Sequence, residues 1–430
     1  MAAVATASHF VSPTTTVHDQ LKLTDLANEL LLAILEFCPD IASLLNIAHT
    51  HPTLYYLAYE YQVVLAAQVL KNELPEEVYV HANLASRGIP ISIGNPDDLV
   101  EDDITNTIGA VALFKDTFLS SLKSSILGAL EVSRFHRKVV DLTEVCLREC
   151  FECRTQLFTP LQLSLERRKP SRSERIRIQQ SIYLFEILRK TCKDMYVGKD
   201  QAHNYYLEFY YKLGELHISL MDYFLAPWEM YQVIAIQAFF RRALHGFERD
   251  ETVSERAMPG LLTLGIPFLH EALFTKTQDE RDEFIRPYEE EVLTKPIHAF
   301  GMVLSRGARR TWTRKQPKPH ASYKRFGTED ASGVRMWERI EAKQLEMFTD
   351  DPQWTDMFDY ELARLEGRLD LWSAALWDAD RWGDILQTLS LPEPSCWKGI
   401  QHHCEPMELG FYIAKNIHRQ HWMLNETVEG

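Results

Sequence analysis

The stretch "LANELLLAILEFCPDIASLLNIAHTHPTL", residues 26–54, decides the fold of the N-terminal part of this chain. Six apolar residues follow one another from Leu30 to Leu35. A helix at the surface of a protein normally carries one apolar stripe, whereas these residues cover a helix on most sides. The stretch therefore predicts a short helix whose extra apolar surface meets either the rest of the chain or a partner.

Breaks in the sequence divide this region into three short predicted helices. Asn28 is the predicted N-cap of a helix that runs from residue 29 to about residue 38. Asp40 begins a second helix that ends near residue 49, and Pro52 begins a third that continues to Leu70. Three short helices with tight connections have little room for a core of their own, and small domains are marginally stable alone.

These helices resemble the F-box, a family whose pattern is a leucine and a proline, Glu-Leu-Leu, Ile-Leu, a break and a leucine-rich second helix. The predicted partner-binding residues are those that match this pattern, together with the proline at the break: Leu26, Glu29, Leu30, Leu31, Ile34, Leu35, Pro39, Leu44, Leu45 and Ile47. The sequence departs from the family at Ala27, where proline is preferred. His51 and Pro52 replace Cys-Arg, and Leu54 replaces tryptophan.

The resemblance implies a non-catalytic function. An F-box protein is a substrate-recognition adaptor of an SCF-type E3 ubiquitin ligase, and its F-box docks on a Skp1-type linker protein that joins it to the cullin assembly. The remaining helical body would recruit an unknown protein substrate. Docking of this kind packs apolar helix faces into a partner's groove. Because the F-box region and its partner are both acidic, apolar burial rather than charge must drive it.

Three alternatives remain open at the level of sequence. The three helices could pack only on the chain's own body. The chain could be a helical interaction scaffold with a degenerate F-box and no ligase assembly. It could also be an all-α enzyme whose site carries no recognisable motif, since no P-loop, G-x-S-x-G, G-x-G-x-x-G or H-E-x-x-H pattern occurs. No cofactor is predicted.

Two segments further along the chain are similar to a large group of fungal F-box proteins with a helical C-terminal region. These are "RIQQSIYLFEIL", residues 177–188, and "FLAPWEMYQVIAIQAFF", residues 224–240. The first belongs to a helix predicted over 176–195 with Ser173 as its cap. In the second, Pro227 suits the first position of a helix.

The whole pattern predicts an all-α protein, because no alternation of period two persists anywhere in the chain. An N-terminal three-helix F-box is followed by a large helical body. The predicted divisions are a disordered tail over 1–19, the F-box over 20–70, the body over 71–304 with an exposed connection near 88–107, a basic loop over 305–327 and a C-terminal helical section over 328–430. The basic loop holds eight Lys or Arg residues and no acid.

Two groups of residues have the chemistry of metal ligands. Cys146, Cys150 and Cys153 with His136 contain enough ligands for zinc, but their spacing is helical and cysteine is a common core residue. We therefore predict that they are core residues. The second group, Cys396 and the contiguous residues 402–404, suits a tetrahedral site poorly and is predicted to be a fortuitous loop.

Composition excludes several classes of protein. The 430 residues carry a formal net charge of −15, which argues against a nucleic-acid-binding protein. No segment has the roughly 18–20 consecutive apolar residues that cross a bilayer, so no membrane partner is predicted. The first basic residue is Lys22, which argues against a secretory signal or a transit peptide. Seven cysteines indicate no disulfide framework, and we predict a cytoplasmic or nuclear location.

Overall fold

The fold is all-α, as the sequence predicts. The computed structural model describes residues 23–87, 125–151, 169–191, 227–245, 253–254 and 257–294, together with Leu376 and Asp378. This described part is 84% helical, contains eleven α-helices and has no strand. Within it, no helix is long and apolar enough to cross a membrane.

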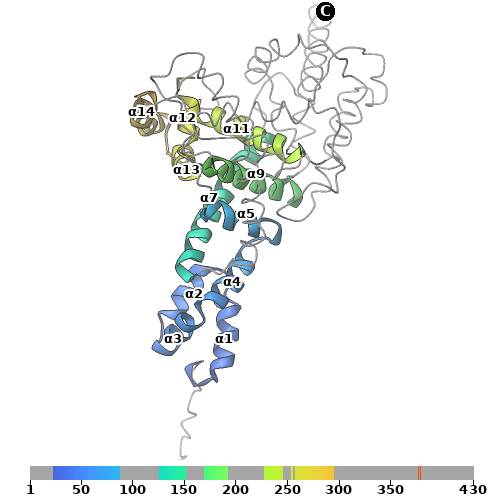
Figure 1. The fold of residues 1–430 in the computed structure, drawn as a ribbon, viewed down its shortest axis with the longest axis vertical. Helices are drawn as coiled ribbons and strands as arrows, with labels where there is room; N and C mark the ends of the chain where they lie inside the picture. Colours follow the sequence, from blue (N-terminus) through green and yellow to red (C-terminus); the bar gives the residue numbers. More distant parts are fainter. Residues whose placement is uncertain are drawn as a thin grey trace, which may run out of the picture.

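Three short helices at one end of the molecule form what we call the N-terminal module (Figure 1). A 3-10 turn, Leu23–Asp25, precedes them. The helices are α1 (Asn28–Glu36), α2 (Ile41–Ala48) and α3 (Pro52–Glu60). α3 packs against both α1 and α2, so the module is a compact layer of helix on helix.

Helix α7 links this module to the rest of the protein. It runs over Ile126–Phe151, so its 26 residues span about 39 Å. Its partners include α2 and α4 (Gln62–Glu73) towards the module, and α5 (Glu76–Arg87) and α9 (Arg172–Thr191) beyond it. A single long helix therefore contacts both ends of the described structure (Figure 1).

The body lies at the other end and is arranged around α9 (Figure 1). Helix α9 packs on α5, on α7 and on α11 (Pro227–His245). The outer helices are α12 (Met258–Leu262), α13 (Ile266–Leu273) and α14 (Gln278–Thr294). Apolar side chains recur along α9 at helical spacing, and the positions predicted from the sequence are all buried: Ile178, Ile182, Phe185, and Leu188 with Arg189.

Local sequence signals set several helix boundaries. Asp40 is the N-cap of α2, and its Oδ1 accepts a hydrogen bond of 2.7 Å from the Ser43 amide. Pro52 and Pro227 occupy the first positions of α3 and α11, as predicted. The helix after the second sequence break starts at Arg172 rather than Ile176.

Two capping predictions are also wrong, and so is the prediction of a single helix over 52–70. Asn28 lies inside α1, because Ala27 has the extended backbone of an N-cap and the helix starts one residue earlier. Ser173 lies inside α9, and Ser171 caps that helix instead. The predicted helix over 52–70 is two helices that divide at Tyr61: α3 packs on α1 and α2, whereas α4 also packs on α7.

Several predicted regions lie outside the described residues. These are the tail over 1–19, the connection near 88–107, the basic loop over 305–327, and the C-terminal section apart from Leu376 and Asp378. Cys153 and the Cys396 group also lie outside them.

Candidate partner-docking surface

The structure divides the ten predicted partner-binding residues by where their side chains lie. Three are fully buried inside the module and its junction with the body: Leu31, Leu35 and Leu44. Three are partly buried against this core: Leu26, Leu45 and Ile47. Four are exposed: Glu29, Leu30, Ile34 and Pro39. The ten residues all belong to one sequence pattern, yet some of them form the core of the module and others face solvent.

Helix α1 carries an exposed apolar stripe. Leu30 is 54% exposed, Ile34 37% and Phe37, at the C-cap of the helix, 85%. Their spacing of four and three residues places them on one face of the helix. Meanwhile Leu31 and Leu35 point into the core. The extra apolar surface that the sequence predicts for this helix is thus present, and no described segment of the chain covers it. We call these three residues the α1 stripe.

Helix α3 adds an exposed aromatic group to the same module. Tyr55, Tyr56 and Tyr59 are all exposed, and we call them the tyrosine cluster. The rings of Tyr55 and Tyr56 meet edge to face with centroids 6.0 Å apart, and His49 stacks on Tyr55 at 6.2 Å. Tyrosine supplies a large contact area with few rotatable bonds and is enriched in protein interfaces.

Two residues at the end of α4 hold the turn between α1 and α2. The Asn72 side-chain amide donates hydrogen bonds to the Glu36 carbonyl at 2.7 Å and to the Cys38 carbonyl at 3.0 Å. The Glu73 carboxylate accepts a hydrogen bond from the Ile41 amide at 3.2 Å. The turn therefore has a fixed geometry, and the α1 stripe is presented on a rigid element.

The departures from the F-box pattern have structural roles here. His51 is the N-cap of α3, and its Nδ1 accepts a hydrogen bond of 3.2 Å from the Thr53 amide. Pro52 fits the first turn of the helix, where its missing N–H would have no partner in any case. Leu54 is buried in the core of the module. These residues therefore fix the start of α3 and its packing in the module.

Reasoning from the sequence missed several residues of this surface. Phe37 continues the spacing of Leu30 and Ile34, so the helical period could have identified it. The tyrosine cluster lies in a segment where apolar and aromatic residues are too dense for one face to stand out. Asn72 and Glu73 give no local signal, because the residues they bind lie more than thirty positions away.

Two cysteines of the predicted group, Cys146 and Cys150, belong to the core, as predicted, and Cys153 lies outside the described residues. Cys146 and Cys150 are buried in α7 with their sulfurs 3.8 Å apart. Burial, together with the hydrogen bond to Cys150 and nearby negative charge, raises the pKa of the Cys146 thiol. His136 is hydrogen-bonded to the Tyr183 hydroxyl at 2.6 Å. Among the described residues, no three His, Cys, Asp or Glu side chains are arranged to hold a metal ion.

Comparison of the chain with models of known protein families, with curated proteins and with solved structures finds no match in any of the three.

Proposed function

We propose that this chain is a substrate-recognition adaptor of an SCF-type E3 ubiquitin ligase. Its N-terminal module would dock on a Skp1-type linker protein and so join the cullin assembly. The observation that carries the proposal is the α1 stripe, which exposes three large apolar side chains on a helix that resembles the F-box. The adaptor itself would perform no chemistry, and its place of action would be the cytoplasm or the nucleus.

Exposure of the stripe supports docking on physical grounds. Burying a large apolar side chain contributes about 1.5 to 3 kcal/mol, so three such residues suffice for an interface anchor. The core residues of the module need no partner, because Leu31, Leu35 and Leu44 are already covered by the chain. The apolar residues in this part of the sequence therefore exceed what the fold uses.

The arrangement of the molecule also suits an adaptor. The module lies at one end, and the helices α11–α14 lie at the other (Figure 1). A linker protein bound to the α1 stripe would leave the body accessible to a second protein. The body would then recruit the substrate that the assembled ligase modifies.

Capture of a Skp1-type linker protein tests the proposal. The variant Leu30→Glu/Ile34→Glu places two carboxylates on the exposed stripe, and each would be buried without a partner at the interface. We expect capture to weaken by about 100-fold or more. The fold should survive, because both side chains face solvent in the free chain. Circular dichroism and thermal melting of the same variant check this.

Leu127→Glu is the matched control. Leu127 is 71% exposed and lies on α7, outside the module, so its replacement should leave capture unchanged. A wild-type chain that captures no linker protein where an established F-box does would contradict the adaptor function and favour the helical scaffold. Native mass spectrometry that finds a bound small molecule or metal would favour the enzyme alternative.

A further inference from the structure

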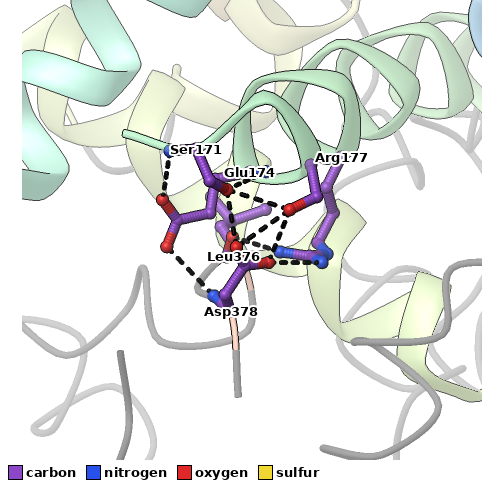
Figure 2. Close-up of polar contacts among 6 residues, drawn as sticks. Ser171, Glu174, Arg177, Leu376 and Asp378 are labelled. Carbon is purple, nitrogen blue, oxygen red and sulfur yellow. Dashed lines mark hydrogen bonds and ion pairs between the residues drawn. The ribbon is translucent and has the colours of Figure 1, made fainter. Parts of the chain in front are cut away.

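A polar cluster at the start of α9 joins residues that are about 200 positions apart in the sequence (Figure 2). Ser171 and Glu174 form a capping box. The Ser171 amide donates to Glu174 Oε2 at 2.9 Å, and the Glu174 amide donates to Ser171 Oγ at 3.0 Å. The helix therefore begins in a fixed geometry, with its positive end facing the cluster.

Leu376 and Asp378 dock on this helix start. Arg177, whose side chain is only 1% exposed, donates to the Leu376 carbonyl at 2.8 Å and to Asp378 Oδ1 at 3.1 Å. The Asp378 amide donates to Glu174 Oε1 at 3.0 Å (Figure 2). The Leu376 side chain is buried. Backbone groups of both residues and the Asp378 side chain are thus held by α9.

Two serine hydroxyls complete the contact with the Asp378 carboxylate. Ser171 Oγ donates to Oδ2 at 2.5 Å. Ser173 Oγ lies 2.9 Å from Oδ1 and 2.8 Å from Oδ2 and donates to the carboxylate. Burial alone would raise the pKa of Asp378, but the two hydroxyls and the Arg177 charge outweigh it and lower the pKa. Asp378 is therefore an anion seated at the positive end of a helix.

The two serines differ in their access to solvent. Ser171 is half-buried and caps the helix, whereas Ser173 is exposed. Residues 167–169 before the serines are Arg-Arg-Lys, and Arg172 precedes Ser173 directly. A basic sequence that includes an exposed hydroxyl residue suits an enzyme with an acidic substrate groove. Ser173 is thus the part of the Asp378 contact that a modifying enzyme can reach.

We propose that Ser173 is a phosphorylation site, and that a phosphate on it displaces Asp378 from the start of α9. In the reaction, Ser173 Oγ forms a bond to the γ-phosphorus of a nucleoside triphosphate. The bond between that phosphorus and the β,γ-bridging oxygen breaks, and the nucleoside diphosphate leaves. The hydroxyl proton passes to a base of the kinase.

The displacement follows from charge. Phosphorylation removes the proton that Ser173 donates and adds about 1.5 to 2 negative charges beside the Asp378 carboxylate. The phosphate also competes with Asp378 for Arg177 and for the positive end of α9. Since an anion in the first turn of a helix stabilises that helix, α9 itself stays folded. Asp378 leaves and withdraws Leu376 with it. This switch would operate whether or not the N-terminal module binds a linker protein.

Hydrogen exchange at the Asp378 amide tests the displacement in the full chain, because that amide is bonded to the buried Glu174 carboxylate. We expect Ser173→Glu to speed its exchange by about tenfold or more through like-charge repulsion. Ser173→Ala, which removes a hydrogen bond without adding charge, should have a smaller effect. Exchange in the middle of α9 should not change in either variant.

A second variant tests whether repulsion between two carboxylates causes the displacement. In Ser173→Glu/Asp378→Asn, the new carboxylate faces an amide that can donate to it, so slow exchange at position 378 should return. Treatment of the wild-type chain with a basophilic kinase and ATP should label Ser173 and speed the same exchange. A kinase that labels other serines but not Ser173, or a Ser173→Glu chain that exchanges like wild type, would overturn the proposal.

Discussion

His136 is the clearest example of a single residue whose chemistry the tertiary structure changes. It lies on α7 with its ring stacked on that of Tyr183 from α9, and the two are hydrogen-bonded at 2.6 Å. Burial, together with the neighbouring Arg137 charge, lowers the pKa of His136 from 6.5 to about 4. The folded protein therefore holds His136 neutral where the unfolded chain would protonate it.

This shift predicts a loss of stability in mild acid. Between pH 6.5 and pH 4 the unfolded chain binds a proton at His136 that the folded chain does not, so the free energy of unfolding falls as pH falls. Between pH 7 and pH 5, His136 alone lowers the free energy of unfolding by about 2 kcal/mol. Urea unfolding at several pH values measures it.

His136→Gln is the control for this prediction, because its amide does not titrate and can still bond to Tyr183. The difference in pH dependence between the wild type and this variant isolates His136 from the other groups that titrate in the same range. Equal slopes in the two proteins would contradict the shift.

At the scale of elements, the turn between α12 and α13 depends on a buried ion pair of α9. Arg189 donates to both oxygens of Glu186, at 2.8 and 2.6 Å, and also to the Thr263 carbonyl at 2.8 Å. Glu186 in turn accepts from the Ile266 amide at the start of α13, at 3.2 Å. Gly265 stands between these contacts with a φ of 83°.

Gly265→Ala should destabilise the protein by about 3 kcal/mol, from the positive φ and a steric conflict together. A Cβ at this position would lie 2.5 Å from Arg189 Nε, so the ion pair would have to shift. Chemical denaturation of the full chain measures the loss.

Gly128→Ala in α7 is the comparison. Gly128 lies in the first turns of a regular helix, where alanine is favoured over glycine by about 0.5 to 1 kcal/mol. A Gly265→Ala chain that is as stable as the wild type would show that the turn has another way to form.

At the scale of the whole molecule, Glu73 joins the N-terminal module to the body. Its carboxylate accepts from the buried Ser133 hydroxyl of α7 at 2.5 Å and from the Ile41 amide at the start of α2. Arg137 of α7 lies 4.0 Å from the same carboxylate. One carboxylate at the end of α4 thus bonds both to the N-terminal module and to α7.

Glu73→Ala should lower the free energy of unfolding by about 2 to 3 kcal/mol, because it leaves buried donors of α2 and α7 without an acceptor. Glu73→Gln keeps one acceptor oxygen and should cost less. Urea denaturation ranks the two variants against wild type. If both variants were as stable as wild type, the link between the module and α7 would not depend on Glu73.

Sequence reasoning predicted those parts of the fold that depend on neighbours in the chain. The helical period of α9, the cap at Asp40 and the starts at Pro52 and Pro227 all follow from residues within one turn. The cap of α9 is Ser171 and not the predicted Ser173, although Ser171-x-x-Glu174 is a capping-box pattern that the sequence itself contains. Only the capping box with Glu174 distinguishes them.

The amino-acid sequence alone is enough to predict a helical protein whose first helices carry more apolar surface than a small module needs. It could not determine which of those apolar residues face solvent, because Leu30 and Leu31 are adjacent and chemically identical. The packing of the helices settles this: α3 and α4 pack on α1, and α7 packs on α2, so Leu31, Leu35 and Leu44 are buried, while no described helix covers the α1 stripe. Likewise, only folding brings Asp378 to Ser173, since burial and charge pairing depend on contacts between distant parts of the chain.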